Sequence, residues 1–247
     1  MAIETYKNAI IKLDHQFQTI YTCPTGKSSV IHSLYCSNTS TSTIYPSFRI
    51  YRPTGPAPHY FYAGNKLRLP PNITLAWDKP LNLKAEDELQ VAETVIADPN
   101  GNLNPSDPTY QHLNVGNVFA SIMELYNNTF ERYNSILKII DEADGPTIVY
   151  TCPSTYANSI IHGLQLTNVS TSSKTFVTIS IVDNDNTAYI LGYKIQVISH
   201  AAFIWDKTIN LTPGQKLRIT VGDPTSGTQA NNAIHAIISL LEVEAIA

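Results

Sequence analysis

The chain has few charged residues for its length. Asp, Glu, Lys and Arg make up 15% of its 247 residues, against about 25% in an average soluble protein. The formal net charge is −4 and no run of Lys or Arg occurs. The chain therefore lacks the basic stripe with which nucleic-acid-binding proteins neutralise phosphates. Since charged groups are depleted at the cores of protein interfaces, this composition favours a protein that acts through contacts with other proteins.

Long hydrophobic runs and paired cysteines are missing as well. No stretch approaches the roughly 18 apolar residues of a membrane helix, and the N-terminus lacks the regions of a signal peptide. We therefore expect that the protein does not contact a membrane. We also expect that it is synthesised in a reducing cytosol. Cys23, Cys36 and Cys152 form no CxxC pair, which is typical of neither a disulfide framework nor a zinc site. We expect buried apolar thiols at Cys23 and Cys152, no metal and no cofactor.

What the chain does contain is an internal duplication. Three sequence blocks occur in the same order in each half: Tyr-Thr-Cys-Pro at 21–24 and 150–153, Ile-His-x-Leu-x-x-x-Asn-x-Ser-Thr at 31–41 and 161–171, and Trp-Asp-Lys at 77–79 and 205–207. Solenoid repeats are only about 20–50 residues long, whereas each unit here has the size of an ordinary domain. We predict two domains, residues 1–127 and residues 128–247. Because no flexible linker separates them, we expect them to pack closely.

The local patterns predict an all-β fold. Short runs rich in Ile, Val, Tyr and Thr alternate with turn residues at spacings of about 8–12 residues, which is typical of sandwiches and jelly rolls. We predict two tandem β-sandwich domains, jelly-roll-like, with almost no helix. Residues 8–13 and 134–140, which precede the two series, fit either a short helix or a first strand.

Several residues could be mistaken for chemical sites. His32 and His162 are paired by the repeat, but no Gly-x-Ser-x-Gly or other nucleophile motif accompanies them, so we interpret them as structural. Trp77 and Trp205 could stack on sugars, but tryptophans that end strands usually pack inward. Residues 183–186 (Asp-Asn-Asp-Asn) lack the glycine and distal glutamate of an EF-hand calcium loop, so we predict a hairpin turn. We expect no catalytic residues and no enzymatic activity.

The two halves differ most in one loop. The first half carries residues 96–115 where the second half carries only residues 222–232. Long loops on a rigid sandwich are frequent sites of function. We predict that the longer loop docks on a neighbouring subunit or another protein, with Tyr110, His112 and Leu113 as interface residues.

The repeated motif resembles small virion proteins of tailed bacteriophages, of the kind found in cyanophages and marine phages. The resemblance rests on the Tyr-Thr-Cys-Pro and Ile-x-x-Leu-x-x-x-Asn-x-Ser blocks and on a closing segment, Leu-Thr-Pro-Gly-Gln-Lys-Leu-Arg-Ile at 211–219. The corresponding residues 83–91 depart from it, since they lack the glycine. The resemblance covers nearly the whole chain twice and carries no catalytic residues across.

This resemblance implies a duplicated, jelly-roll-like structural protein located in the virion and made in the host cytoplasm. Its role would be that of a capsid decoration, neck or tail component, with other virion proteins and copies of itself as partners. The alternative is a carbohydrate-binding module or adhesin domain pair, which Tyr- and Trp-rich loops and possible Ca²⁺-binding turns favour. A glycan is the less favoured partner of the two, and neither nucleic acid nor a membrane is expected.

Overall fold

A computed structural model of the chain describes residues 5–54, 59–93, 116–126, 131–170, 174–222 and 233–244. The strands of the first half are β1 (Thr5–Lys12), β2 (Gln18–Thr22), β3 (Lys27–Asn38), β4 (Pro46–Tyr51), β5 (Tyr60–Gly64), β6 (Thr74–Trp77), β7 (Leu81–Leu83), β8 (Glu88–Glu93) and β9 (Gly116–Tyr126). Those of the second half are β10 (Glu131–Asp141), β11 (Pro146–Thr151), β12 (Tyr156–Asn168), β13 (Thr175–Val182), β14 (Ala188–Val197), β15 (Ala202–Trp205), β16 (Ile209–Leu211), β17 (Lys216–Val221) and β18 (Ala233–Glu244). Within these residues the helical content is one 3₁₀ turn, η2 (Glu142–Asp144).

Each half forms two antiparallel sheets of its own. In the first half the strand orders are β1-β9-β3-β6, with β7 also paired to β3, and β2-β8-β4-β5. In the second half they are β10-β18-β12-β15, with β16 paired to β12, and β11-β17-β13-β14. Every strand of one half thus has a counterpart at the same place in the other half. The predicted all-β fold of two β-sandwiches is confirmed, and the segments left open between helix and strand are strands β1 and β10.

Alternate residues of each strand fill the space between the two sheets. In β9, Val118, Ala120 and Ile122 point into the first core, where Phe48 and Leu89 come from the opposite sheet. This period of two follows from the pleat of a strand, which sends neighbouring side chains to opposite faces. Each fully buried aliphatic or aromatic side chain contributes about 1.5–3 kcal/mol relative to its exposed state.

The three cysteines are free and buried. Cys23 and Cys152 occupy equivalent places where β2 and β11 end, and each is 1% exposed. The prediction that they are small buried residues is confirmed.

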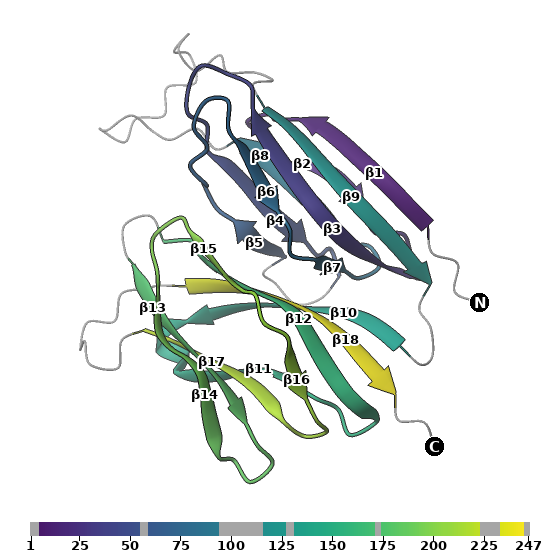
Figure 1. Ribbon diagram of the computed structural model, residues 1–247, viewed down its shortest axis with the longest axis vertical. Helices are drawn as coiled ribbons and strands as arrows, with labels where there is room; N and C mark the ends of the chain where they lie inside the picture. Colours follow the sequence, from purple (N-terminus) through teal and green to yellow (C-terminus); the bar gives the residue numbers. More distant parts are fainter. Residues whose placement is uncertain are drawn as a thin grey trace.

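The two sandwiches pack against each other (Figure 1). The borders of the first half at β5 and β7 lie next to β15, β12, β18 and β10 of the second half. Among the described residues no helix is long and apolar enough to cross a membrane.

Candidate functional site: the interface between the two halves

The two halves meet edge to face. β5 is the edge strand of its sheet, and together with the short strand β7 it contacts β10, β12 and β18. These three strands belong to one sheet, and one face of that sheet covers the core of the second half. The first half therefore covers the outer face of that sheet, so that the sheet is buried on both sides.

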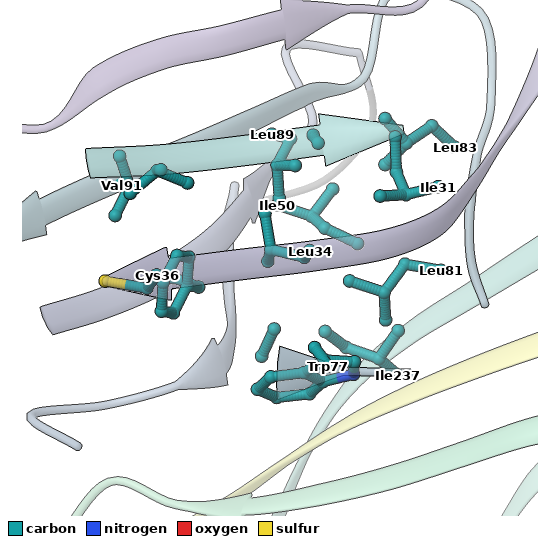
Figure 2. Packing of buried hydrophobic residues seen from close by; sticks show 14 of the residues in the cluster. Ile31, Leu34, Cys36, Ile50, Trp77, Leu81, Leu83, Leu89, Val91 and Ile237 are labelled. Atoms are coloured by element: carbon teal, nitrogen blue, oxygen red, sulfur yellow. The ribbon is translucent and has the colours of Figure 1, made fainter. Parts of the chain in front are cut away.

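Strand β18 shows this double burial residue by residue. Ile234, Ala236 and Ile238 belong to the core of the second half. Ile237, between them, points the other way and joins the core of the first half at 1% exposure. Figure 2 shows Ile237 beside Trp77 and close to Leu81. Four more side chains of the second half pack against the same core: Leu137, Ile139, Ala202 and Ile204.

Polar side chains of the second half satisfy the backbone of the edge strand β5. The Ala63 carbonyl accepts hydrogen bonds from Gln165 Nε2 and from Thr167 Oγ1, the latter at 2.8 Å. The Tyr62 N–H donates to His235 Nδ1 at 3.1 Å. Unpaired backbone groups on an edge strand invite pairing with other chains. Here side chains of the second half bind these backbone groups in place of another strand. Because these side chains have fixed positions, they set the register of the contact.

Asn82 on β7 ties the halves together at a second place. It is fully buried, and its backbone N–H donates to Ser239 Oγ at 3.0 Å. Its side-chain Nδ2 lies 3.0 Å from the Asn134 carbonyl oxygen and 3.2 Å from the Leu240 carbonyl oxygen. One side chain of the first half therefore serves as donor to two strands of the second.

Replacing Asn82 with alanine is expected to lower the free energy of unfolding by about 1–3 kcal/mol, because two buried carbonyls lose a donor. The repeat supplies a matched control, since Asn210 occupies the same place on β16 and is exposed. Asn210→Ala is expected to change the free energy by no more than about 0.5 kcal/mol. Urea unfolding of both variants measures the difference, and equal losses would contradict the role given to Asn82.

A glycine allows the close approach of the two backbones. A Cβ atom at Gly163 would lie 3.0 Å from the Pro80 carbonyl oxygen of the first half. Gly163 follows a register shift in the pairing of β12 with β18, between Ile161 and Gly163. Because Gly163 has no side chain, the segment at Pro80, just before β7, packs directly on β12.

The paired histidines lie at equivalent bulges but in different surroundings. The pairing of β3 with β9 shifts between Ile31 and Ser33, so His32 occupies the bulge that His162 occupies in β12. His162 Nε2 lies 3.3 Å from Asn82 Nδ2 in the interface, whereas His32 is exposed. Burial and then the nearby His32 lower the pKa of His162. These contacts support the structural interpretation of His162.

His235 is expected to make the stability of the protein depend on pH. Burial lowers the pKa of His235 to about 4, against about 6.5 in the unfolded chain. The folded state therefore holds the neutral ring, whose Nδ1 accepts from Tyr62, and protonation opposes folding. The contribution is complete above pH 6.5 and is lost as the pH falls towards 4, by about 3 kcal/mol in total at 1.36 kcal/mol per pKa unit.

Free energies of unfolding measured between pH 7 and pH 4 test this expectation. His235→Asn keeps a possible acceptor without a titrating ring, so its profile is expected to be flatter in that window. A wild-type profile that matches the variant would show that His235 does not titrate as described.

Each half also holds a buried polar network next to its cysteine. In the first half the Tyr21 hydroxyl lies 2.8 Å from Ser29 Oγ and donates to Glu124 Oε1 at 2.9 Å. Ser29 Oγ lies 3.1 Å from Cys23 Sγ. The network joins β2 to β3 and β9 across the sandwich.

The second half repeats this network with the same residue types. The Tyr150 hydroxyl lies 2.7 Å from Ser159 Oγ and donates to Glu242 Oε1 at 2.8 Å. Ser159 Oγ lies 3.2 Å from Cys152 Sγ. A duplicated arrangement in two domains with different surroundings is explained by a role in folding the domain.

The titration behaviour of the first network agrees with a structural role. Burial raises the pKa of Cys23 to about 11, so the thiol stays protonated and is a poor nucleophile. Burial also opposes the charge of Glu124, but hydrogen bonds from Lys27, Lys7 and Tyr21 outweigh it and hold its pKa at about 2. These groups are locked in the ionisation states that hold the strands together.

A cavity of about 370 Å³ opens where the halves meet. Four cationic residues line it: Lys27, Arg52, Lys84 and Arg132. Two of the charges are paired, with Arg52 Nη2 at 2.5 Å from Asp87 and Lys27 Nζ at 2.8 Å from Glu124. Arg52 also donates to Ser135 Oγ of the second half at 2.9 Å, so this cluster contributes to the contact between the halves.

The remaining predicted sites divide into those that the structure describes and those that it does not. Tyr110, His112 and Leu113, with the rest of residues 96–115, lie outside the described residues, so their interface role stays a prediction. Residues 183–186 form the turn of the β13–β14 hairpin, closed by the Asp183 N–H to the Thr187 carbonyl at 2.8 Å, which confirms the hairpin. No group of three or more His, Cys, Asp or Glu placed to hold a metal is found in the described part of the chain.

The two tryptophans pack inward, to different degrees. Trp77 is 4% exposed and makes an edge-to-face contact with Phe48, with ring centroids 6.5 Å apart. Trp205 is partly buried against the core of the second half and beside Phe203. The predicted core position is confirmed for Trp77, while Trp205 lies at the margin of its core.

No family model matches this chain, and no curated protein matches it. Among solved structures, the major capsid protein P2 of bacteriophage PM2 is 10% identical, with a TM-score of 0.33 and 98% of each chain covered. A chain from Sulfolobus turreted icosahedral virus is 11% identical with a TM-score of 0.28, and the match covers 99% of this chain but 58% of that one. The N-terminal CBM22 tandem domain of Paenibacillus barcinonensis Xyn10C is 7% identical with a TM-score of 0.27, covering 98% of this chain and 93% of that chain. At these TM-scores the likenesses carry no argument about function, which has to come from residues of this chain.

Proposed function

We propose that this chain is a non-enzymatic structural protein of a virus particle and acts through protein–protein contacts. The observation that carries the proposal is a set of large apolar side chains in each half that are 37–74% exposed. They are Tyr6, Ile10, Tyr35, Tyr60 and Ile73 in the first half, and Ile148, Tyr189, Ile190, Tyr193 and Ile198 in the second. Tyr6 and Ile10 share β1, and Tyr189, Ile190 and Tyr193 share β14, so several of these side chains lie near one another. Exposed apolar residues that gather in this way mark sites of contact with other proteins or ligands, and tyrosine is enriched at interfaces.

The buried titratable groups support a structural role. Glu124 is held by two lysines, with Lys7 Nζ at 2.6 Å and Lys27 Nζ at 2.8 Å. His235 accepts from the edge strand of the other half. Each of these groups holds strands or halves together, and none is positioned beside a reactive nucleophile.

The more specific proposal is a tailed-phage virion protein: a capsid decoration, neck or tail component whose partners are other virion proteins and copies of itself. Its support is the resemblance of the duplicated motif to small virion proteins of such phages. The low charge of the chain agrees with a surface that is largely covered in an assembly.

Particles purified from infected cultures that make this chain test the proposal. Mass spectrometry is expected to find the chain in the particles, and antibodies against it are expected to label the head, neck or tail in electron micrographs. Absence from the particles would contradict the proposal. Binding of the purified protein to a glycan array, lost on replacing an exposed aromatic residue, would favour the carbohydrate-binding alternative.

A further inference from the structure

The second half contacts the first through the outer face of one sheet, and one row of register-paired residues crosses that face. Across the sheet β10-β18-β12-β15 this row is Leu137, Ile237, Gln165 and Ile204. The three apolar members pack against the core of the first half, and Gln165 donates to the Ala63 carbonyl. This row is therefore the part of the sheet with which the second sandwich binds the first.

The first half has the same row on the same face, but there it is open. Across β1-β9-β3-β6 the register-paired residues are Ile10, Phe119, Tyr35 and Ala76. Ile10 is 74% exposed and Tyr35 is 42% exposed, and the Tyr35 ring lies tilted beside the Phe119 ring with 6.2 Å between centroids. A row that is covered in one half is therefore presented to solvent in the other. The far end of the same face of the first half, at Val30 and Met123, is buried beside Tyr133 of the second half.

The edge strand that docks also has an open counterpart. Gly64 of β5 pairs with β4 where Gly192 of β14 pairs with β13. Each glycine is followed two residues later by a lysine at positive φ, Lys66 at 51° and Lys194 at 48°. These shared irregularities show that β5 and β14 are the same edge in the two sandwiches.

The two edges differ in length, since β5 has 5 residues and β14 has 10, and in what covers them. Phe61 of β5 is 7% exposed, packed in the first core and against His235 of the second half, whereas Tyr189, its counterpart in β14, is 56% exposed. The next residue of β14, Ile190, is 58% exposed. Asn82 is fully buried in the internal contact, whereas its counterpart Asn210 is exposed.

We propose that a second copy of this chain binds edge to face, with β14 of one copy lying on the outer face of the sheet β1-β9-β3-β6 of the next. The contact repeats between molecules the one that the two halves make within a molecule. The inference rests on the proposed function in one respect, namely that the chain assembles with copies of itself, and it names the surfaces that do so.

The chemistry of the two surfaces is complementary. Ile10 and Phe119 offer an apolar strip for Tyr189 and Ile190, as Leu137 and Ile237 do for the edge β5. Tyr35 occupies the strand position that Gln165 occupies in the second half. Gln165 donates to the Ala63 carbonyl of the docked edge, and the Tyr35 hydroxyl can donate to a docked edge in the same way. Burial of such side chains contributes about 25 cal/mol for each Å² of apolar surface removed from water.

Two further positions determine how closely the open face and the edge of a second copy approach each other. Ser121 occupies the place of Ser239, which accepts from the Asn82 backbone, so it can accept from Asn210 in the same way. Ser33 occupies the place of Gly163. A Cβ at Gly163 would lie only 3.0 Å from the Pro80 carbonyl oxygen. The Ser33 Cβ therefore requires Thr208, the counterpart of Pro80, to lie a few tenths of an ångström further from the sheet.

Each copy would use two different surfaces, and this determines the type of assembly. β1 and β14 lie at opposite ends of the molecule in Figure 1, so occupation of one surface leaves the other free. Contacts between unlike surfaces give closed rings or open filaments rather than symmetric dimers.

Two charge variants test the two surfaces separately. Ile10→Asp places a carboxylate on the face and Ile190→Asp places one on the edge. Each is expected to raise the dissociation constant of self-association on the order of 100-fold, since an unpaired charge would be buried. Ile148→Asp is the matched control, because Ile148 is exposed but lies on β11, at the edge of its sheet opposite to β14 and outside the sheet β1-β9-β3-β6. Sedimentation velocity over a concentration series measures association, and unchanged melting temperatures show that the variants are folded.

A mixture of the two variants separates this arrangement from a symmetric one. At a concentration just sufficient for the wild type to associate, neither variant alone is expected to do so. A mixture is expected to form a dimer and nothing larger, because one intact edge meets one intact face. Variants that associate as the wild type does would overturn the inference while leaving self-assembly, and so the proposed function, in place. A wild-type protein that stays monomeric would overturn the inference, and the particle experiment above would then decide the proposed function alone.

Discussion

Replacing Trp77 with alanine is expected to lower the free energy of unfolding by about 3–5 kcal/mol, the usual cost of deleting a large buried aromatic side chain. Trp77 ends β6 at 4% exposure, and its ring contacts Phe48 of the opposite sheet. It also lies beside Ile237 of the second half (Figure 2). Its loss therefore opens a cavity where the core of the first half and the contact between the halves meet.

Trp205→Ala is the matched control, since Trp205 occupies the same place in the repeat but is only partly buried. A clearly smaller loss is expected, because fewer contacts and less area are removed. Chemical unfolding followed by circular dichroism measures both values. A Trp77→Ala protein as stable as wild type would contradict its assignment to the core.

Ile237→Asp is expected to lower the free energy of unfolding by at least about 4 kcal/mol, since it removes a buried aliphatic side chain and buries an unpaired charge. Ile237 is 1% exposed and lies between the two sandwiches. A carboxylate there must either be protonated or force the halves apart.

The repeat again provides the comparison. Phe119 is the counterpart of Ile237 on the open face of the first half and is partly exposed. A carboxylate at Phe119 stays in contact with water, so Phe119→Asp is expected to cost the isolated molecule much less. Similar losses at both positions, measured by urea unfolding, would contradict the conclusion that one face is covered and the other open.

The duplication made most of the fold predictable from the sequence. Matching blocks around Tyr21 and Trp77 have counterparts at Tyr150 and Trp205, so strands predicted in one half were supported by the other. The segments before each series stayed ambiguous, because Ile- and Leu-rich runs of that length fit helix or strand by local pattern alone. Pairing with the last strand of the same half decides in favour of strands β1 and β10.

The interface was less accessible to sequence reasoning. Asn82 and Asn210 are identical residues at the same place of closely similar segments, residues 77–83 and 205–211, yet one is fully buried and the other exposed. That difference arises from how the halves pack, which the local sequence does not encode. Glu124 and Glu242 did carry a signal, because Ser-x-x-Glu occurs near the end of both halves, at residues 121–124 and 239–242. Their partners, Tyr21 and Tyr150, lie far away in sequence, and the hydroxyl–carboxylate contacts became visible only in the folded chain.

The central claim is that one edge-to-face contact is used twice, once inside the molecule and once between molecules. Electron cryo-microscopy of the self-assembled protein tests it most directly. The account predicts β14 of one copy on the outer face of β1-β9-β3-β6 of the next, with Ile190 near Ile10 and Phe119. Assemblies held by two copies of the same surface, or by surfaces that leave β14 and Ile10 exposed to solvent, would contradict it.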